Sequence, residues 1–303
     1  MVTLVAWWSG LSEHAKGLLI TATGVLILTP DALLLKLIEA GPWTILVWRG
    51  LGFLFVIGLV SALRHGSNVF RVIRATGLIG LAITGLHAAG QLLFVFSIHN
   101  TTAANTLVII AAAPLAAALL ARLILGERTA RRTLIAGFVA LAAVGLTVQG
   151  GIQVGGLWGD LAAIGVMLVL ALVFVLLRKA KGRDMLPALA WGGLITAGIA
   201  LVMAPTVTVT GADRLYLPLL VLLVVPLSFV LISTGPRYLP APEVGLLMLL
   251  ETILGPLWVW LVLLEAPAPA SLVGGAIIIL TLATNAWLGL REQRRRRIAP
   301  APA

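Results

Sequence analysis

Residues 156–177 read GLWGDLAAIGVMLVLALVFVLL, an apolar run with one charged residue that ends at Arg178 and Lys179. A helix of about 20 residues, rising 1.5 Å per residue, crosses a hydrocarbon core of roughly 30 Å. Similar runs recur along the whole chain, separated by charge clusters, Pro or Gly pairs and short polar gaps. The sequence therefore predicts an all-α integral membrane protein.

Composition supports the same class. The chain is 60% hydrophobic and 11% charged, with a mean hydropathy of +1.11, far from the values of soluble domains. The net charge of +10 would suggest nucleic acid in a soluble protein, but here the basic residues lie between apolar runs, where they set topology. We therefore expect no nucleic-acid partner. Cysteine is absent, so thiolate metal sites and disulfides are excluded, and no cofactor is expected.

The gaps between apolar runs divide the chain into ten predicted spans. The first span follows Glu13, His14 and Lys16, has spanning length and lacks a small-x-small cleavage site, so it is predicted to be a transmembrane helix and not a signal peptide. Gly150-Gly151 is predicted to be the turn after the fifth span. The predicted spans are 17–38, 43–63, 74–98, 101–125, 132–149, 156–177, 187–207, 215–236, 243–264 and 271–290.

Basic residues favour one side of the membrane. Placing the N-terminus inside leaves only Lys36, Arg49 and Arg214 toward the outer face. Because Lys and Arg accumulate in cytoplasmic loops, we expect a multi-pass protein of the cell inner membrane with both termini cytoplasmic. The basic tail, residues 291–303, either anchors the last helix or also contacts anionic lipid. The residues assigned to the cytoplasm are Lys16, Arg64, Arg71, Arg74, Arg128, Arg131, Arg132, Arg178, Lys179, Lys181, Arg183, Arg237, Arg291 and Arg294 to Arg297.

The chain contains a weak internal repeat. Laying residues 103–137 over residues 241–275 matches Glu127 with Glu265, each at the end of a predicted span. Each half then holds five spans, so the second copy, residues 151–290, must enter the membrane inverted relative to the first, residues 1–150. Inverted repeats are typical of transporters that work by alternating access around a central cavity.

The order of several short motifs resembles that of a known family. The first half carries Ala113-Pro114-Leu115 in its fourth span and Leu125-Gly126-Glu127 at the end of that span, after an early Lys36 and Trp48-Arg49-Gly50. Together these resemble the EamA-type members of the drug/metabolite transporter superfamily over nearly the whole chain. The resemblance implies ten helices around a central cavity and transport of a small metabolite, often by export.

The second half departs from the pattern of this family in two places. Many members carry Glu-Pro in the ninth helix, where this chain has Glu251-Thr252, and the expected Leu-Gly-Glu is Leu263-Leu264-Glu265. The missing proline removes an expected kink, which Gly255-Pro256 could replace one turn later.

Ionisable residues inside spans are costly and need a partner, water or a function. Asp31 and Arg49 are both predicted to lie roughly 10 Å from the outer end of their spans, where they either pair with each other or contact substrate. Pro30 frees a backbone carbonyl beside them, either for a ligand or as a packing kink. Lys36 lies nearer the interface, where snorkelling explains it. Glu251 is a candidate cavity carboxylate for a substrate ammonium or a coupling proton, or a structural carboxylate.

The third span presents a polar face. His87, Gln91 and Phe94 recur at helical spacing and either line the cavity or bond between helices. Trp158 and Asp160 begin the sixth span, where Trp158 either guards the outer mouth or is an interfacial anchor. Asn105 and Asn285 are predicted to form interhelical hydrogen bonds. The candidate substrate-binding residues are Glu251, His87, Gln91, Phe94, Trp158, Asp31 and Arg49.

These features predict a secondary transporter that acts as a monomer on a small-molecule substrate, surrounded by lipid and with protons as possible coupling ions. An amino acid or similar zwitterion, exported from the cell, is the favoured cargo because the spans offer both acidic and basic groups. The alternatives are an exporter of cationic amines or drugs and a membrane-embedded enzyme. No P-loop, His-Glu-x-x-His helix or Gly-x-Ser-x-Gly elbow is present, which argues against an ATP-driven pump or a common hydrolase.

Overall fold

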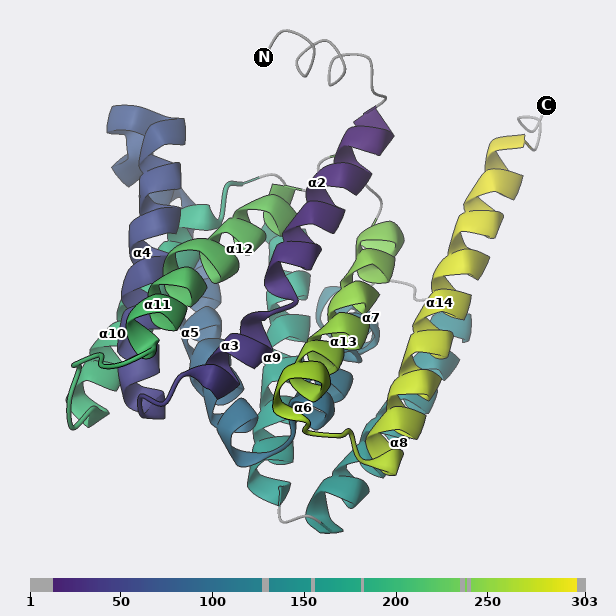
Figure 1. The fold of residues 1–303 in the computed structure, drawn as a ribbon. Helices are drawn as coiled ribbons and strands as arrows, with labels where there is room; N and C mark the ends of the chain where they lie inside the picture. The colour runs from purple at the N-terminus through teal and green to yellow at the C-terminus, as the bar shows by residue number, and fades with distance from the viewer. Residues whose placement is uncertain are drawn as a thin grey trace, which may run out of the picture.

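The computed structural model describes residues 13–126, 131–153, 156–180, 183–234, 238 and 241–298. Helices are the regular secondary structure of the described residues, and they form a bundle of tilted helices (Figure 1). The elements in chain order are α2 (Glu13–Leu28), α3 (Asp31–Leu37), α4 (Pro42–His65), η1 (Gly66–Asn68), α5 (Val69–Asn100), α6 (Ala103–Ile110), α7 (Ala113–Leu125), α8 (Arg131–Gln153), α9 (Leu157–Ala180), α10 (Leu186–Met203), α11 (Asp213–Pro218), η2 (Leu219–Val224), α12 (Val225–Thr234), α13 (Ala241–Leu263) and α14 (Pro269–Ile298).

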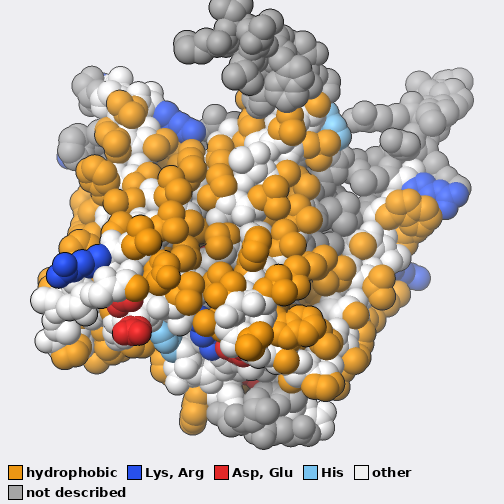
Figure 2. All heavy atoms as spheres, viewed as in Figure 1, with side chains coloured by type: hydrophobic (Ala, Val, Ile, Leu, Met, Phe, Trp, Pro, Cys, Tyr) orange, Lys and Arg blue, Asp and Glu red, His pale blue; other side chains and the backbone are white. Residues whose placement is uncertain are grey.

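The helices follow the apolar runs closely. Within the described residues, eight helical segments are long and apolar enough to cross a membrane, and two further apolar helices, Leu134–Gln149 and Leu250–Leu263, are shorter. The first residue of α2 and the last of α14 lie at the same end of the bundle (Figure 1). On the face seen in Figure 2, hydrophobic side chains cover the middle, and most of the visible charged side chains lie toward its edges.

Several helix boundaries differ from those predicted by four residues or more: α5 begins at Val69 and not at 74, and α10 ends at Met203 and not at 207. The turn expected at Gly150-Gly151 was wrong, because α8 continues to Gln153. Glycine permits a turn but also tolerates a helix, so a glycine pair alone does not end one. At the other end of the chain, α14 extends to Ile298, so part of the basic tail is helical.

Proline divides two of the predicted spans into shorter helices. Pro30 separates α2 from α3, and Pro114, in the first turn of α7, follows the break after α6. A proline has no N–H to donate to the carbonyl four residues earlier, so the helix is weakened at that point. By contrast α13 continues through Pro256. The breaks in the first and fourth spans place backbone polar groups inside the bundle.

Small residues bring helices of the two halves into close contact. A side chain on Gly50 of α4 would collide with the backbone of α10, 2.7 Å from the nitrogen of Ala197 and closer still to the carbonyl of Gly193. Glycines at such contacts let membrane helices approach at backbone distance. The α4–α10 contact therefore fixes Arg49, the neighbour of Gly50, next to the second half of the chain.

Candidate functional site

The break between α2 and α3 builds one side of the candidate site. The Leu26 carbonyl, left free because Pro30 has no N–H, accepts a hydrogen bond of 2.9 Å from the hydroxyl of Thr29. The Thr29 hydroxyl in turn accepts a hydrogen bond of 3.1 Å from the indole N–H of Trp258 on α13. The break thus ties the first span to α13 and starts α3 with Asp31 at its N-terminus.

Asp31 and Arg49 form a buried ion pair. The two terminal nitrogens of Arg49 donate to the two carboxylate oxygens of Asp31 at 2.6 and 2.8 Å, and each residue is only 4% exposed. This bidentate geometry matches the planar guanidinium to the carboxylate. The Nε of Arg49 is buried without a hydrogen-bond partner among the described residues. The pair predicted from the depth of these two residues is present, and one donor of Arg49 remains for another group.

Aromatic and amide side chains surround Arg49. The Arg49 guanidinium lies 5.5 Å from the centre of the Phe94 ring, within the range of a cation–π contact. His87 is close enough to Arg49 to interact with it electrostatically and shares a hydrogen bond of 2.9 Å with Gln91. The Gln91 carbonyl oxygen is buried and unbonded within the described residues. An unpaired donor and an unpaired acceptor therefore lie in the same polar region.

Glu251 approaches this region from α13. It is partly buried and lies close enough to both Asp31 and Arg49 to interact electrostatically. No hydrogen bond or ion pair of Glu251 is present within the described part of the chain. Trp258 lies two turns later, on the same face of α13, and bonds to the break in the first span. Glu251 is therefore a carboxylate inside the bundle that forms no ion pair with any residue the structure describes.

Six of the seven sequence-predicted site residues gather here. The structure brings Asp31, Arg49, His87, Gln91, Phe94 and Glu251 into one region from α3, α4, α5 and α13. Trp158 is not part of it, because it is 71% exposed at the start of α9.

Sequence reasoning missed the aromatic side chains that complete the region. Phe53 and Phe229 lie 4.5 and 5.8 Å from the His87 ring, measured between ring centres, and 5.3 Å from each other. Trp258 was also missed. In so apolar a chain an aromatic residue carries little signal by itself. The i, i+7 spacing of Glu251 and Trp258 would have placed both on one face of α13.

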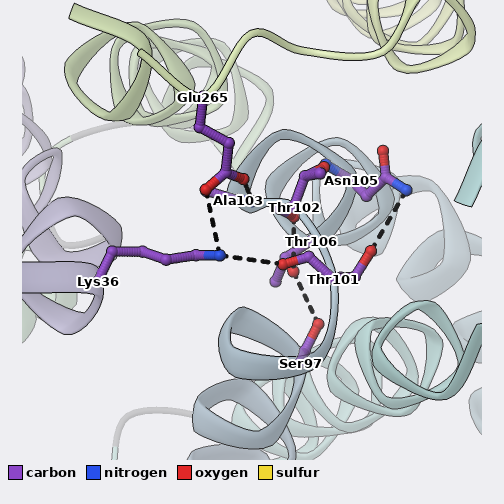
Figure 3. A network of polar contacts seen from close by, with 8 residues as sticks. All are labelled: Lys36, Ser97, Thr101, Thr102, Ala103, Asn105, Thr106 and Glu265. Carbon is purple, nitrogen blue, oxygen red and sulfur yellow. Dashed lines mark hydrogen bonds and ion pairs between the residues drawn. The ribbon is translucent and has the colours of Figure 1, made fainter. Parts of the chain in front are cut away.

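A second polar cluster lies where α3, the α5–α6 junction and the α13–α14 loop meet (Figure 3). The Lys36 ammonium pairs with the Glu265 carboxylate at 3.3 Å and donates to the Thr101 carbonyl at the same distance. Glu265 also accepts from the backbone N–H of Ala103, the first residue of α6, at 3.3 Å. Lys36 is therefore held by an ion pair, which replaces the snorkelling expected from sequence.

Asp160 supports the same junction from α9. Its carboxylate is fully buried and accepts hydrogen bonds from the Thr101 hydroxyl at 2.7 Å and from the Asn105 amide at 3.1 and 3.2 Å. Ser271 of α14 donates to the carbonyl oxygen of the Asn105 side chain. The interhelical role predicted for Asn105 is confirmed. Asp160 contributes to this junction and has no contact with the Asp31–Arg49 pair.

The described residues contain no group of three His, Asp or Glu side chains that could hold a metal ion. What the arrangement offers is hydrogen bonding and charge inside a membrane-spanning bundle. Buried carboxylates, a guanidinium and an amide can bind a polar solute or exchange a proton.

Comparison with known proteins finds a family match in the first half of the chain. Residues 15–149 match the model of the EamA-like transporter family. Residues 15–149 are therefore similar to the EamA-type members of the drug/metabolite transporter superfamily. The resemblance seen in the sequence motifs is thereby confirmed for residues 15–149. EamA proteins are membrane transporters of small molecules and not enzymes. The apolar helices of this chain agree with the multi-pass membrane architecture of that family.

A structural comparison covers nearly the whole chain. A solved crystal structure of another protein superposes on this chain with a TM-score of 0.65 at 20% sequence identity, covering 92% of this chain and 99% of the other. At that identity the likeness concerns the fold alone. No curated protein sequence matches the chain.

Proposed function

We propose that this chain is an EamA-type secondary transporter that exports a small polar metabolite across the inner membrane by alternating access. The observation that carries the proposal is the Asp31–Arg49–Glu251 cluster, which places three ionisable groups from both halves of the chain inside one membrane-spanning bundle. Such groups are costly in a membrane and mark solute or proton pathways.

Helix boundaries support an architecture of ten crossings as two inverted repeats. When α2–α3, α6–α7 and α11–η2–α12 are each counted as one segment, the described helices form ten segments. The fourth segment spans 103–125 and the ninth spans 241–263, so both ends correspond when residues 103–137 are laid over 241–275, the alignment found in the sequence. Because five segments in each half is an odd number, the second unit has the opposite orientation.

The contacts between helices support the same architecture. In an arrangement of two five-segment repeats, the two-fold relation maps each segment onto the segment five places away. A contact between two segments is therefore matched by a contact between the two segments to which they map. The packing of α5 on α9 is matched by that of α12 on α2, and the packing of α6 and α7 on α9 by that of α13 on α2 and α3. The segments α4 and α10 are five places apart, as are α8 and α14. The two-fold relation therefore maps the contact within each of these pairs onto itself.

Backbone conformation adds independent support. Gly126 ends α7 with φ of 66°, and Leu264, its counterpart in the same alignment, follows α13 with φ of 56°. Leu264 is the single non-glycine residue with positive φ in the described chain. A left-handed leucine is unfavourable, so its occurrence at the matching position points to a backbone shape kept by both halves.

An amino acid or a similar zwitterion is the favoured cargo. Glu251 offers a negative charge to an ammonium group, while the Nε of Arg49 and the carbonyl of Gln91 offer an unused donor and acceptor. The surrounding rings of Phe53, Phe94 and His87 provide an apolar wall. The ammonium of a zwitterion would face Glu251, and its carboxylate would face the Nε of Arg49.

A cationic amine is the second candidate, favoured by one specific observation. Both terminal nitrogens of Arg49 are already bound to Asp31, which leaves little positive charge for a substrate carboxylate. Glu251 has no such partner within the described residues. A cation would therefore find a free carboxylate beside aromatic rings, which attract cations at their faces.

The Lys36–Glu265 cluster supplies an outer closure for alternating access. It joins α3 and the α5–α6 junction of the first half to the α13–α14 loop of the second (Figure 3). Opening the bundle at this end requires these three segments to separate. We propose that the pair breaks when the site opens to the outside.

A ligand screen tests the proposed function. The purified protein would be heated in detergent with amino acids and with organic amines, and the compounds that raise its melting temperature would be assayed for flux in proteoliposomes. We expect stabilising amino acids to be transported. Transport of amines alone would favour the second candidate, and stabilisation without flux of any hit would contradict a transport function for this site.

A further inference from the structure

An apolar groove lies on the lipid-facing side of the molecule, away from the polar cluster. Its walls come from α4 on one side and from α11 and η2 on the other, and its volume is about 420 Å³. This volume falls in the range of about 300–1,000 Å³ that small-molecule sites occupy. The lining residues are Trp48, Leu51, Gly52, Phe55, Val209, Arg214, Leu217, Pro218, Val221 and Leu222.

The floor of the groove is a close helix contact. A side chain on Gly52 would come within 2.9 Å of the Val221 Cβ, so α4 and η2 touch at backbone distance there. Beside this contact the ring of Phe55 is 66% exposed, and Leu51 and Leu222 are also exposed. The groove is therefore open toward the surroundings, which at this depth are hydrocarbon. An apolar chain is the ligand that such a surface accommodates without loss of hydrogen bonds.

One charged residue lines the groove, at the end where α11 begins. Arg214 is exposed, and its Nε donates to the Val209 carbonyl at 3.3 Å, which orients the guanidinium. Within the described residues Arg214 has no ion pair, and the neighbouring Asp213 is engaged by the backbone N–H groups of Glu39 and Ala40. The two terminal nitrogens of Arg214 remain available for an anion.

The connection before α11 is fixed to α4 at the same end. The indole N–H of Trp48 donates to the Val207 carbonyl at 3.0 Å, and the Thr44 hydroxyl donates to the Thr206 carbonyl at 2.7 Å. The position of Arg214 relative to the groove is therefore set by hydrogen bonds on both sides. A guanidinium at the membrane interface, above an apolar groove, is complementary to a phospholipid. The guanidinium can bind the phosphate at the surface, and the groove can hold an acyl chain below it.

We propose that this groove binds a phospholipid of the adjacent leaflet, with its phosphate on Arg214 and one acyl chain between α4 and η2. The site is distinct from the cargo site and bridges the two halves of the chain, since α4 belongs to the first and α11–η2 to the second. The charge of Arg214 selects a lipid with a phosphate, and the Gly52–Val221 contact sets the depth available to the chain.

Native mass spectrometry of the detergent-solubilised protein tests this site. The probes are phosphatidylglycerol and a diacylglycerol with the same acyl chains but no phosphate. We expect the parent protein to retain one phosphatidylglycerol, and Arg214→Gln to retain it about fivefold less, the effect of one basic residue near a lipid surface. Diacylglycerol should bind the two proteins equally. Leu222→Trp, which fills the groove, should reduce retention of both lipids.

Arg71→Gln is the matched control, because Arg71 is an exposed arginine at the start of α5, away from the groove. It should retain phosphatidylglycerol like the parent, and melting temperatures would confirm that all variants fold. Equal retention by Arg214→Gln and the parent would overturn the proposal. An equal loss of phosphatidylglycerol in Arg71→Gln would also overturn it, because it would indicate unspecific attraction. So would the mass of a protein dimer in place of the mass of the protein with one lipid.

Discussion

The Asp31 carboxylate and the Arg49 guanidinium lie inside the bundle, where neither has access to bulk water. Each compensates the burial of the other through two hydrogen bonds. Removing one partner from a buried pair costs about 3–5 kcal/mol, because the remaining charge stays buried without compensation. Removing both is much less costly.

We therefore expect Asp31→Asn and Arg49→Gln each to lower the melting temperature, and the double variant to recover most of the loss. Thermal unfolding in detergent measures this, with Glu39→Gln as a control because that side chain is exposed in the α3–α4 connection. Single variants that melt like the parent but bind cargo weakly would assign the pair to the binding site instead.

Glu251 is the residue that we propose to link charge to transport. We expect Glu251→Gln to fold like the parent, because glutamine keeps the shape and part of the hydrogen bonding of glutamate. Transport should fall by roughly tenfold or more, since hydrogen bonds to charged groups contribute about 1.5–3 kcal/mol. The dependence of flux on pH should also flatten, because the variant cannot exchange a proton at this position.

Flux of the screened cargo into proteoliposomes at several pH values measures both effects, again with Glu39→Gln as the control. An unchanged rate and an unchanged pH profile would remove Glu251 from the site and leave the His87–Gln91 face of α5 as the next candidate.

At the scale of helices, the end of α13 stores backbone strain. Leu264 is 81% exposed and adopts a left-handed conformation that glycine adopts freely and leucine does not. Leu264→Gly should therefore stabilise the protein by about 1 kcal/mol, the cost of a left-handed residue with a Cβ.

The same substitution at Leu123 is the control. Leu123 is 79% exposed but lies within α7, where glycine should destabilise by about 1 kcal/mol relative to a good helix former. Melting temperatures should thus move in opposite directions. A lower melting temperature for Leu264→Gly would show that the left-handed conformation is not the dominant effect at this position.

Under the proposed alternating access, opening at this end disrupts the junction of α3, α6 and the α13–α14 loop. Because the chain has no cysteine, Ser97→Cys introduces a single thiol beneath the Lys36–Glu265 pair (Figure 3). In intact cells, adding Lys36→Gln should speed labelling of this thiol by an impermeant reagent by up to about fivefold. A partly exposed ion pair contributes up to about 1 kcal/mol.

Lys16→Gln is the matched control, since Lys16 pairs with Glu13 at the opposite end of the bundle. It should leave the labelling rate unchanged. Equal rates with and without Lys36 would show that the pair does not limit access from this side.

At the scale of the whole molecule, the charge distribution and the number of segments make the same prediction. The ten crossings that we propose would return the chain to its starting side, and the excess of basic residues predicts that this side is the cytoplasm. Reporters active on only one side of the membrane should therefore locate both termini in the cytoplasm and the α10–α11 connection, residues 204–212, outside. A translocated C-terminus would contradict the inverted repeat.

The sequence alone predicted the membrane class and most of the helix boundaries. A hydrophobic run long enough to cross the bilayer has one stable form there, because only a helix satisfies its own backbone within a single segment. Sequence also identified six residues of the polar region, since ionisable and polar groups are rare enough in spans to be noticed singly. The Gly150-Gly151 turn was wrong because glycine is compatible with both a turn and a helix.

Only the tertiary structure decided which of these residues meet. Lys36 and Glu265 are far apart in the chain, and their pairing depends on how α3 and the α13–α14 loop pack. The aromatic wall of Phe53 and Phe229 and the groove beside Arg214 likewise arise between helices from different halves. A local pattern determines whether a segment is a helix and how deep a residue lies. It contains no information about which helix faces which, because that depends on the packing of many side chains at once.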